Sequence, residues 1–490
     1  MIVRKCLGMI RLAPAIAVFL AACAVGPDYV KPPAAVPQAY KETEGWKVAE
    51  PKDHMIRGKW WEMFNDPQLN TLEEQVNISN QNIVAAEAQF RQAQALVQAA
   101  RSAYFPTVTV GTSFERSLTS STVSGTRLPV ASTSPVSLFS LPVDGIWELD
   151  LWGRIRRSVE SSRATAQATA ADLESVRLSV QAQVAQNYFQ LRTLDAQKQL
   201  LDETAAAYQK SLELTQNRYN TGVASRADVL QAETQLKTTQ AQAIDVGVLR
   251  AQLEHAMALL IGKPASDFSI PFAPLAASPP PIPVGLPSEL LERRPDIAGA
   301  ERRMASANAQ IGVTVAAYYP TVTLGGSIGL QSTDLSKWLT WPSRFWSYGP
   351  ALSETVFDGG FRGAQAAQAR AVYDATVASY RQTVLTGFME VEDNLSTLRI
   401  LEQEAAVQEE AVKAAQQSLA ISLNQYRAGI IAYLNVIVAQ TTALANQRTA
   451  LDILGRRMTA AVLLVKALGG GWDTSRLPAA DQVTTIQIRR

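Results

Sequence analysis

Two short stretches decide the fold, Tyr219-Asn220-Thr221-Gly222-Val223-Ala224 and Tyr426-Arg427-Ala428-Gly429-Ile430-Ile431, because they are two copies of one turn. The tyrosines and the glycines of the copies are each 207 residues apart, and the same offset relates Gly262 to Gly469. Long stretches rich in Ala, Gln, Leu and Glu, nearly free of proline, flank both turns. Glycine adopts backbone conformations at helix ends that other residues resist. We therefore predict two helical hairpins, one in each half of the chain.

The helices of these hairpins are predicted to be exceptionally long. Residues 362–426 contain no proline, and a continuous α-helix of that span would be roughly 100 Å long. A seven-residue repeat runs through it as Val377, Val384, Val391, Leu398, Ala405, Val412, Leu419 and Tyr426. The first copy, from Trp152 and Gly153 to Tyr219, keeps a 3/4 spacing that Lys198 and Thr215 interrupt. Such repeats indicate coiled-coil packing against partner helices.

A second pattern predicts four β-strands per chain. Residues 107–114 and 139–151 alternate polar and apolar side chains, as do 322–330 and 346–356. The motif of residues 104–109 returns at 318–323, an offset of 214. A free-standing coiled-coil rod would leave the apolar faces of these strands uncovered. Four strands cannot close a barrel in lipid, so we expect several copies to contribute four each; three copies would give twelve strands and twelve long helices.

The N-terminus reads as a secretory signal. Residues 1–22 combine basic residues with a short apolar core, and Leu20-Ala21-Ala22-Cys23 then resembles a bacterial lipobox, in which the cysteine is lipidated. The alternative is an ordinary signal peptide with an incidental cysteine. Ala24 follows the cysteine, and by resemblance to sorted lipoproteins the absence of Asp there favours the outer membrane.

Composition excludes several function classes. The net charge of +1 gives no reason to expect nucleic acid as a partner. Two cysteines and two isolated histidines leave little scope for a metal site, and no clustered acid, base or nucleophile suggests an enzyme. No apolar run of 18 residues or more follows the N-terminus. Purely structural tethering between envelope layers remains a rival interpretation.

The predicted organisation follows from these patterns. A lipoprotein signal peptide (1–22) precedes a lipidated strap (23–65) that is pinned by aromatic residues. Two repeats, 66–262 and 288–469, each contain a helix, a β-hairpin and a long helical hairpin, and the Pro-rich linker 263–287 joins them. The C-terminal tail, 470–490, is expected to be loosely ordered.

Taken together, the chain resembles TolC-type outer-membrane factors, in the lipoprotein branch of outer-membrane efflux channels that serve RND-type tripartite systems. The residues that carry the resemblance are Leu20 to Cys23 with Val25-Gly26-Pro27-Asp28-Tyr29, the helix opening from Leu286 to Ile297, the paired Tyr-x-x-Gly turns and Phe357-Asp358-Gly359-Gly360. The resemblance implies a mixed α and β membrane fold in a homotrimer, with a twelve-stranded barrel and a periplasmic α-helical tunnel. It implies an exit channel for small molecules that docks to a periplasmic adaptor and an inner-membrane pump. Type I protein secretion is the alternative.

The resemblance also assigns site residues. No cofactor is implied beyond the S-diacylglycerol and N-acyl (palmitate-type) lipid on Cys23. The hairpin tips form the periplasmic entrance, with adaptor-contact turns at Gly222, Val223, Gly429 and Ile430. The gate is assigned to Leu434, Val438, Asp228 and Arg226. Some members carry a carboxylate where this chain has Val438, so we expect a gate closed mainly by apolar contact and hydrogen bonds. Alternatively, Asp228 is only a charge at a helix N-terminus.

Overall fold

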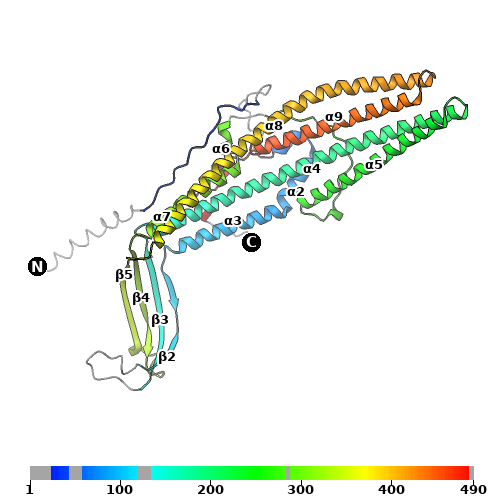
Figure 1. The fold of residues 1–490 in the computed structure, drawn as a ribbon. Coiled ribbons are helices and arrows are strands. Elements are labelled where there is room, and N and C mark those ends of the chain that lie inside the picture. Colours follow the sequence, from blue (N-terminus) through cyan, green and yellow to red (C-terminus); the bar gives the residue numbers. More distant parts are fainter. Residues whose placement is uncertain (1–23, 43–57, 119–133, 277, 283–286, 485–490) are drawn as a thin grey trace.

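The computed structural model describes residues 24–42, 58–118, 134–276, 278–282 and 287–484. Cys23, the signal peptide and most of the loop after the first predicted strand lie outside them. Long helices extend from one end of a small sheet (Figure 1). The main helices are α2 (Pro67–Ser79), α3 (Gln81–Ser102), α4 (Arg154–Asn220), α5 (Arg226–Leu260), α6 (Leu290–Arg293), α7 (Pro295–Ala316), α8 (Phe361–Arg427) and α9 (Tyr433–Ala467). The strands are β1 (Thr107–Val110), β2 (Ser113–Ser117), β3 (Val136–Leu149), β4 (Thr321–Ser332) and β5 (Arg344–Ser353).

The sheet joins the two repeats side by side. Strands β1 and β2 both pair with β3, so the first predicted strand is interrupted at residues 111–112. Strand β3 pairs antiparallel with β4, with Leu149 opposite Val322, and β4 pairs with β5. The predicted hairpins are therefore confirmed, and the pairing of β3 with β4 brings together segments that are distant in the sequence. The two outer sides of the sheet remain open in the single chain.

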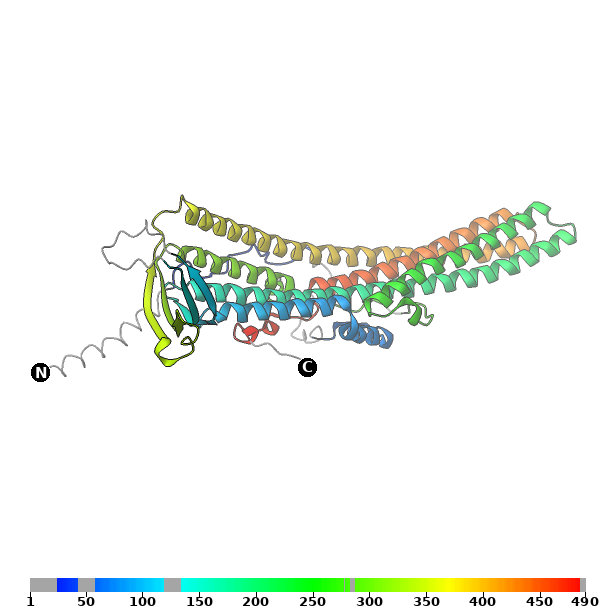
Figure 2. The same cartoon turned by 90° about the horizontal axis from the view of Figure 1, so that it is seen from below.

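The helices form one curved layer. Helix α4 packs against α3, α5, α7 and α9, and α8 packs against α7 and α9. In Figures 1 and 2, α5 lies end to end with α3, and α9 lies end to end with α7. Helices α5 and α9 thus extend each row toward the hairpin ends far from the sheet. The two 67-residue helices α4 and α8 confirm the predicted long helices. Among the described residues no helix is both long and apolar enough to cross a membrane.

Helices α2, α3 and α5 meet at Asn80, and we call this meeting point a joint. The sequence suggested one helix from residue 66 to 104, but Asn80 is extended (φ −67°, ψ 122°) and separates α2 from α3. Its Oδ1 accepts hydrogen bonds from the backbone N–H groups of Asn82 (2.9 Å) and Ile83 (3.0 Å), which caps α3. Its Nδ2 donates to the carbonyl oxygen of Leu260 at the end of α5 (2.6 Å). One side chain thus satisfies both helix ends that meet there.

The second repeat builds the same joint with a charged residue. Arg294 lies 214 residues after Asn80 and is extended before Pro295, so the helix predicted from residue 286 is also broken. Its Nη1 donates to the carbonyl oxygen of Ala467 at the end of α9 (3.0 Å) and to Glu390 of α8 (2.7 Å). Its Nη2 donates to Asp296 (2.8 Å).

Glycine is required where the chain leaves each joint. A Cβ at Gly262 would lie 2.2 Å from the carbonyl oxygen of Ser79, and one at Gly469 would lie 2.1 Å from that of Arg293. Both glycines have positive φ angles, 69° and 94°. The offset of 207 residues between them, visible in the sequence, therefore marks a close backbone approach repeated in both halves.

An irregular strap, residues 24–42, runs along one face of the layer. The N–H of Val25 donates to the carbonyl oxygen of Trp152 (3.0 Å) beside the sheet, and the hydroxyl of Tyr29 donates to Glu301 of α7 (2.8 Å). At the other end of the strap, Arg399 of α8 binds Glu42 (2.5 Å). The short helix Trp60–Phe64 then buries its aromatic rings in the main core, which confirms the predicted pinning by aromatics.

The linker between the repeats crosses α4 and α5 on a buried network. Asp195 of α4 accepts hydrogen bonds from Arg250 Nε (2.7 Å) and from the N–H of Ala273 (3.1 Å). Arg192 donates to the carbonyl oxygen of Pro271 (2.7 Å), and Arg250 to that of Ile270 (2.8 Å). The Pro-rich segment is therefore held by charged side chains of the first hairpin.

The tail differs from its predicted loose order. Trp472 is buried against Ala171 of α4 and Ala298 of α7, and Val483 is buried against α3 and α4. Gln167 of α4 also donates a hydrogen bond to the carbonyl oxygen of Pro478 (3.0 Å). Trp472, Leu477 and Val483 thus attach residues 472–484 to the helix layer.

Candidate functional site at the hairpin tips

Both hairpins end with the same backbone geometry. The N–H of Val223 donates to the carbonyl oxygen of Arg218 (2.8 Å), and that of Ile430 donates to Gln425 (2.9 Å). Gly222 (φ 75°) and Gly429 (φ 78°) take the left-handed conformation that this helix ending requires. The backbone conformation predicted for the two turn glycines is confirmed.

The helices that leave the two turns begin differently. Helix α5 starts with a capping box, in which Asp228 Oδ2 accepts from the N–H of Ser225 (3.0 Å) and Ser225 Oγ accepts from the N–H of Asp228 (3.1 Å). Helix α9 starts after Ala432, which provides no side-chain cap. The carboxylate of Asp228 thus serves its own helix end, as the alternative interpretation of this residue expected. Arg226 lies 6.0 Å from the ring centroid of Tyr219.

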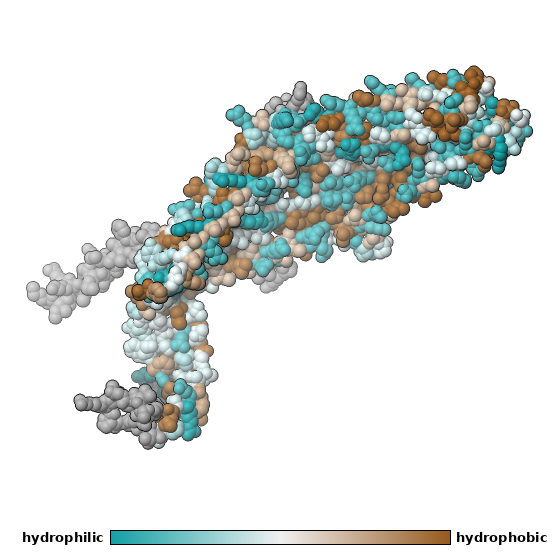
Figure 3. Space-filling view, viewed as in Figure 1, coloured by the Kyte–Doolittle hydropathy of each residue, from teal (hydrophilic) through white to brown (hydrophobic). Residues whose placement is uncertain are grey.

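Apolar side chains are exposed around the tips. Leu434 and Val438, four residues apart on one face of α9, are 57% and 59% exposed in the single chain. Val223 and Ile430, in the turns themselves, are 64% and 72% exposed. Figure 3 shows hydrophobic side chains gathered at the far end of the hairpins. An apolar cluster of this kind at the end of a layer is suited to contact with another protein surface.

A clasp that the sequence did not reveal holds the two tips together. Arg218, in the last turn of α4, donates from Nη1 to the carbonyl oxygens of Tyr426 (3.0 Å) and Arg427 (3.1 Å). Its guanidinium also lies 4.8 Å from the ring centroid of Tyr426. A cation at carbonyls that end a helix is favoured by the helix dipole. A basic residue near a helix end was visible in the sequence, but nothing there identified a partner 208 residues away.

Buried hydroxyl groups continue the contact below this clasp. The hydroxyl of Tyr426 donates to Thr215 Oγ1 (3.4 Å), and that of Tyr433 lies 3.2 Å from Ser211 Oγ. The two tyrosine rings pack with centroids 5.2 Å apart. Burial raises the pKa of Tyr433 above its ordinary value, so this hydroxyl stays protonated. Thr215, which interrupted the apolar pattern of α4, is thus a buried partner between hairpins.

The tips present exposed apolar side chains and hydrogen-bonded helix ends. Within the part of the chain that the structure describes, no three His, Cys, Asp or Glu residues are grouped to hold a metal ion. The predicted residues Leu434, Val438, Val223 and Ile430 offer apolar surface, whereas Asp228 and the clasp residue Arg218 stabilise helix ends. Which of them close an entrance or touch an adaptor stays a prediction.

Comparisons with known proteins cover nearly the whole chain. The sequence profile described as "Outer membrane efflux protein" matches residues 72–263 and 286–470. The chain is 30% identical over 460 residues to the probable efflux pump outer membrane protein TtgC of Pseudomonas putida, covering 93% of this chain and 94% of that protein. It is 30% identical over 424 residues to the pyoverdine export outer membrane protein OpmQ of Pseudomonas aeruginosa, covering 85% and 88%.

Solved structures agree with these sequence matches. The outer-membrane channel OprN superposes with a TM-score of 0.85 at 30% identity, covering 92% of this chain and 100% of that one. The outer membrane protein VceC of Vibrio cholerae superposes with a TM-score of 0.77 at 27% identity, covering 85% and 99%. The long helical hairpins and the small sheet are therefore features shared with outer-membrane channels.

Proposed function

This chain belongs to the outer membrane efflux protein family, and from that premise we propose that it is the exit channel of a tripartite efflux system. It is an outer-membrane efflux component, a duct rather than an enzyme. In the proposal, small molecules pass from a periplasmic adaptor and an inner-membrane pump through this channel to the outside. The observation that carries the proposal is the geometry of one chain: an amphipathic sheet at one end and two helical hairpins that end together at the other.

A homotrimer accounts for the open sides of the sheet. Unpaired strand edges are not viable in lipid, and β1 with β2 on one side and β5 on the other are the edges of this sheet. Trp346 and Tyr348 of β5 are 68% and 82% exposed, which fits side chains that face lipid or a neighbouring copy. Three copies would together close a barrel of twelve strands, and their helices would surround a tunnel.

Lipid anchoring at Cys23 is the second part of the proposal. Ala24, the next residue, packs against the turn before α4, where a Cβ on Gly153 would lie 2.9 Å from the Cα of Ala24. That turn is the point at which the sheet gives way to the helices. An acyl chain attached one residue earlier would then start at the level of the membrane surface, beside the barrel.

The gate and the adaptor contacts complete the proposal. Leu434 and Val438 would close the periplasmic entrance through apolar contact between three copies, and Arg226 and Asp228 would lie at its rim. Gly222, Val223, Gly429 and Ile430 would meet the adaptor. Support comes from their exposure and from their position at the hairpin ends farthest from the sheet.

Channel activity and cargo are tested by separate measurements. Purified protein in a planar lipid bilayer should produce discrete conductance events, whereas a structural tether would produce none. Deleting the gene in the native host should increase drug susceptibility and leave secreted proteins unchanged. Unchanged susceptibility with a missing exoprotein would overturn efflux in favour of type I secretion.

A further inference from the structure

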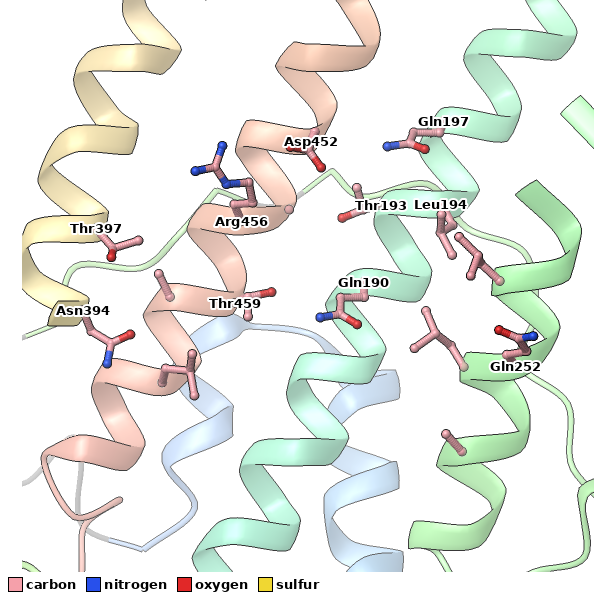
Figure 4. Close-up of a pocket in the computed structure, with 16 residues that line it drawn as sticks. Gln190, Thr193, Leu194, Gln197, Gln252, Asn394, Thr397, Asp452, Arg456 and Thr459 are labelled. Carbon is pink, nitrogen blue, oxygen red and sulfur yellow. The ribbon is translucent and has the colours of Figure 1, made fainter. Parts of the chain in front are cut away.

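A hollow lies on one face of the helix layer, midway between the sheet and the tips. It has a volume of about 770 Å³ and is lined by residues of α4, α5, α8 and α9 (Figure 4). Gly455 of α9 and Thr193 of α4 form its floor, where a Cβ on Gly455 would lie 2.5 Å from Thr193 Oγ1. A volume of this size accommodates a drug-sized molecule.

The hollow faces away from the strap and the linker where the structure describes them. On α4, Gln190 and Gln197 line the hollow, whereas Arg192 and Asp195 bind the linker. Because an α-helix turns 100° per residue, these two pairs of side chains point to opposite sides of α4. The same holds on α8, where Thr397 lines the hollow. Glu392 and Arg399 of α8, on the other side, bind the strap. The layer therefore has a wrapped face and a bare face, and the hollow is on the bare face.

The bare face is the face that would line a conduit. Three layers that close around an axis must turn one face inward, and the strap, linker and tail need room that only the outer side provides. This step rests on the proposed function, because without a closed assembly there is no inward face. Substances that pass through the channel would then travel across the hollow.

The walls of the hollow combine apolar and polar groups. Leu194, Leu249 and Leu253 form an apolar side next to α5. Figure 4 shows the polar side chains of Gln190 on α4 and Thr459 on α9. An amphipathic molecule could place its apolar body against the leucines and its polar atoms against amide and hydroxyl groups.

The charges at the hollow favour a cation. Asp452 is exposed and forms no hydrogen bond or ion pair with any residue that the structure describes. Arg456, one turn further along α9, lies 3.8 Å from Glu404 of α8. The two carboxylates of Asp452 and Glu404 thus stand against the one guanidinium of Arg456, and this charge balance is negative.

We propose that this hollow is a transit site for amphipathic organic cations on the inner wall of the channel. Leu249 and its neighbouring leucines hold the apolar body, and Asp452 attracts the positive charge. The channel would then take part in selecting cargo instead of serving only as a passive duct.

Binding of rhodamine 6G, an amphipathic cation, tests the site directly. The full-length protein in lipid nanodiscs should raise the fluorescence anisotropy of the dye above that of empty nanodiscs. Asp452→Asn should weaken binding about three- to fivefold, the range expected for one solvent-exposed ion pair. Leu249→Gln should weaken it as well, and Thr459→Trp, which fills the hollow, should abolish it.

Matched controls are available on α5. Asp245→Asn removes an exposed carboxylate and Leu259→Gln an exposed leucine, and neither residue lines the hollow. Both variants should bind the dye as the wild type does. Equal binding by all variants, or equal losses in test and control variants, would overturn the proposal.

Single-channel recording separates this proposal from the proposed function. Rhodamine 6G should cause brief blocks of an open channel, and these should disappear in Thr459→Trp. Channels that conduct but show no dye-dependent blocks would refute the transit site and leave channel function intact. Absence of any conductance would refute the channel itself. Dye binding without blocks would place the hollow outside the conduit and also refute the transit site.

Discussion

The two hairpins carry the same charged positions but use them to different degrees. An offset of 207 residues relates Arg192 to Arg399, Asp195 to Glu402 and Arg250 to Arg457. In the first hairpin Asp195 is fully buried and joins Arg192 and Arg250 to the linker. In the second, the side chain of Glu402 is 74% exposed and lies 3.7 Å from Arg457, while Arg399 binds Glu42 of the strap.

Each half of the molecule thus holds an irregular segment at the same height. The first hairpin holds the linker between the repeats, and the second holds the N-terminal strap. The two repeats share this position, but the burial of the charged groups differs, and so we expect the strength of the hold to differ. Buried charges that lose a partner cost far more free energy than exposed ones. The difference teaches that the repeat determines where a segment is held and burial determines how firmly.

The largest expected effect is the loss of the buried carboxylate. Asp195→Ala leaves Arg192 and Arg250 without their shared partner, and we expect a destabilisation of about 3–5 kcal/mol. The matched change Glu402→Ala in the second hairpin should cost about 0–1 kcal/mol. Thermal unfolding followed by the helical circular dichroism signal measures both. Similar losses in the two variants would show that the hairpins are held equally firmly.

The joints give the next largest difference. Arg294→Met removes charge-assisted hydrogen bonds to Glu390, Asp296 and the carbonyl oxygen of Ala467, and should cost about 2 kcal/mol. Asn80→Ala removes a helix cap and should cost about 1 kcal/mol. Limited proteolysis near each joint should report the local loosening. A larger loss at Asn80 would mean that the neutral joint carries more of the stability.

A buried carboxyl group in the first repeat has no counterpart in the second. Glu73 of α2 is fully buried, and no hydrogen-bond partner satisfies its oxygens among the described residues; its equivalent at the 214 offset is Pro287. Burial raises the pKa of Glu73 well above its usual range. The folded state therefore binds this proton more tightly than the unfolded state. Stability should fall as the pH rises above the unfolded pKa of about 4.3 toward the folded value.

Glu73→Gln should remove this pH dependence. The melting temperature of the wild type should decline between pH 5 and pH 8 relative to that of the variant. Glu74→Gln is the control, because Glu74 is an exposed neighbour paired with Lys59. If both variants followed the wild type across this range, Glu73 would be ionised in the folded protein.

The smallest effects on stability, but clear ones on function, are expected at the tips. Leu434→Ala removes exposed apolar surface and should make the closed channel leaky, seen as higher resting conductance or sensitivity to large antibiotics. Arg218→Ala breaks the clasp between the hairpins and should have the same effect at a stability cost of about 1 kcal/mol or less. Leu230→Ala, which replaces an exposed leucine of α5, is the control. Unchanged conductance in both test variants would move the gate elsewhere along the hairpins.

The periodic parts of the fold were predictable from the sequence. Seven-residue spacing in α8 and alternation in β3 and β4 reflect faces that repeat along an element, so local pattern was sufficient. The breaks at Asn80 and Arg294 were not predicted, although the sequence contained a signal for the second of them. Pro295 restricts the residue before it, and the offset of 214 could have transferred that break from Arg294 to Asn80.

Contacts between distant segments were not predictable in the same way. Arg218 meets the end of α8, and Gln190 shares a hollow with residues of α8 and α9, only because the two hairpins lie side by side. A single sequence without an assembled structure contains no record of such neighbours. The role of Asp228 at a helix N-terminus was predictable as one of two alternatives, because a helix start is a local feature.

The strap has a consequence for how the chain folds. Its residues are the first of the described chain to be synthesised, yet Tyr29 binds Glu301 and Glu42 binds Arg399, 272 and 357 residues later. Contacts of such long sequence separation form slowly, because the intervening chain must be ordered first. We therefore expect the N-terminal segment to remain unattached until both repeats have folded, and to seat last, as the step that completes the protomer.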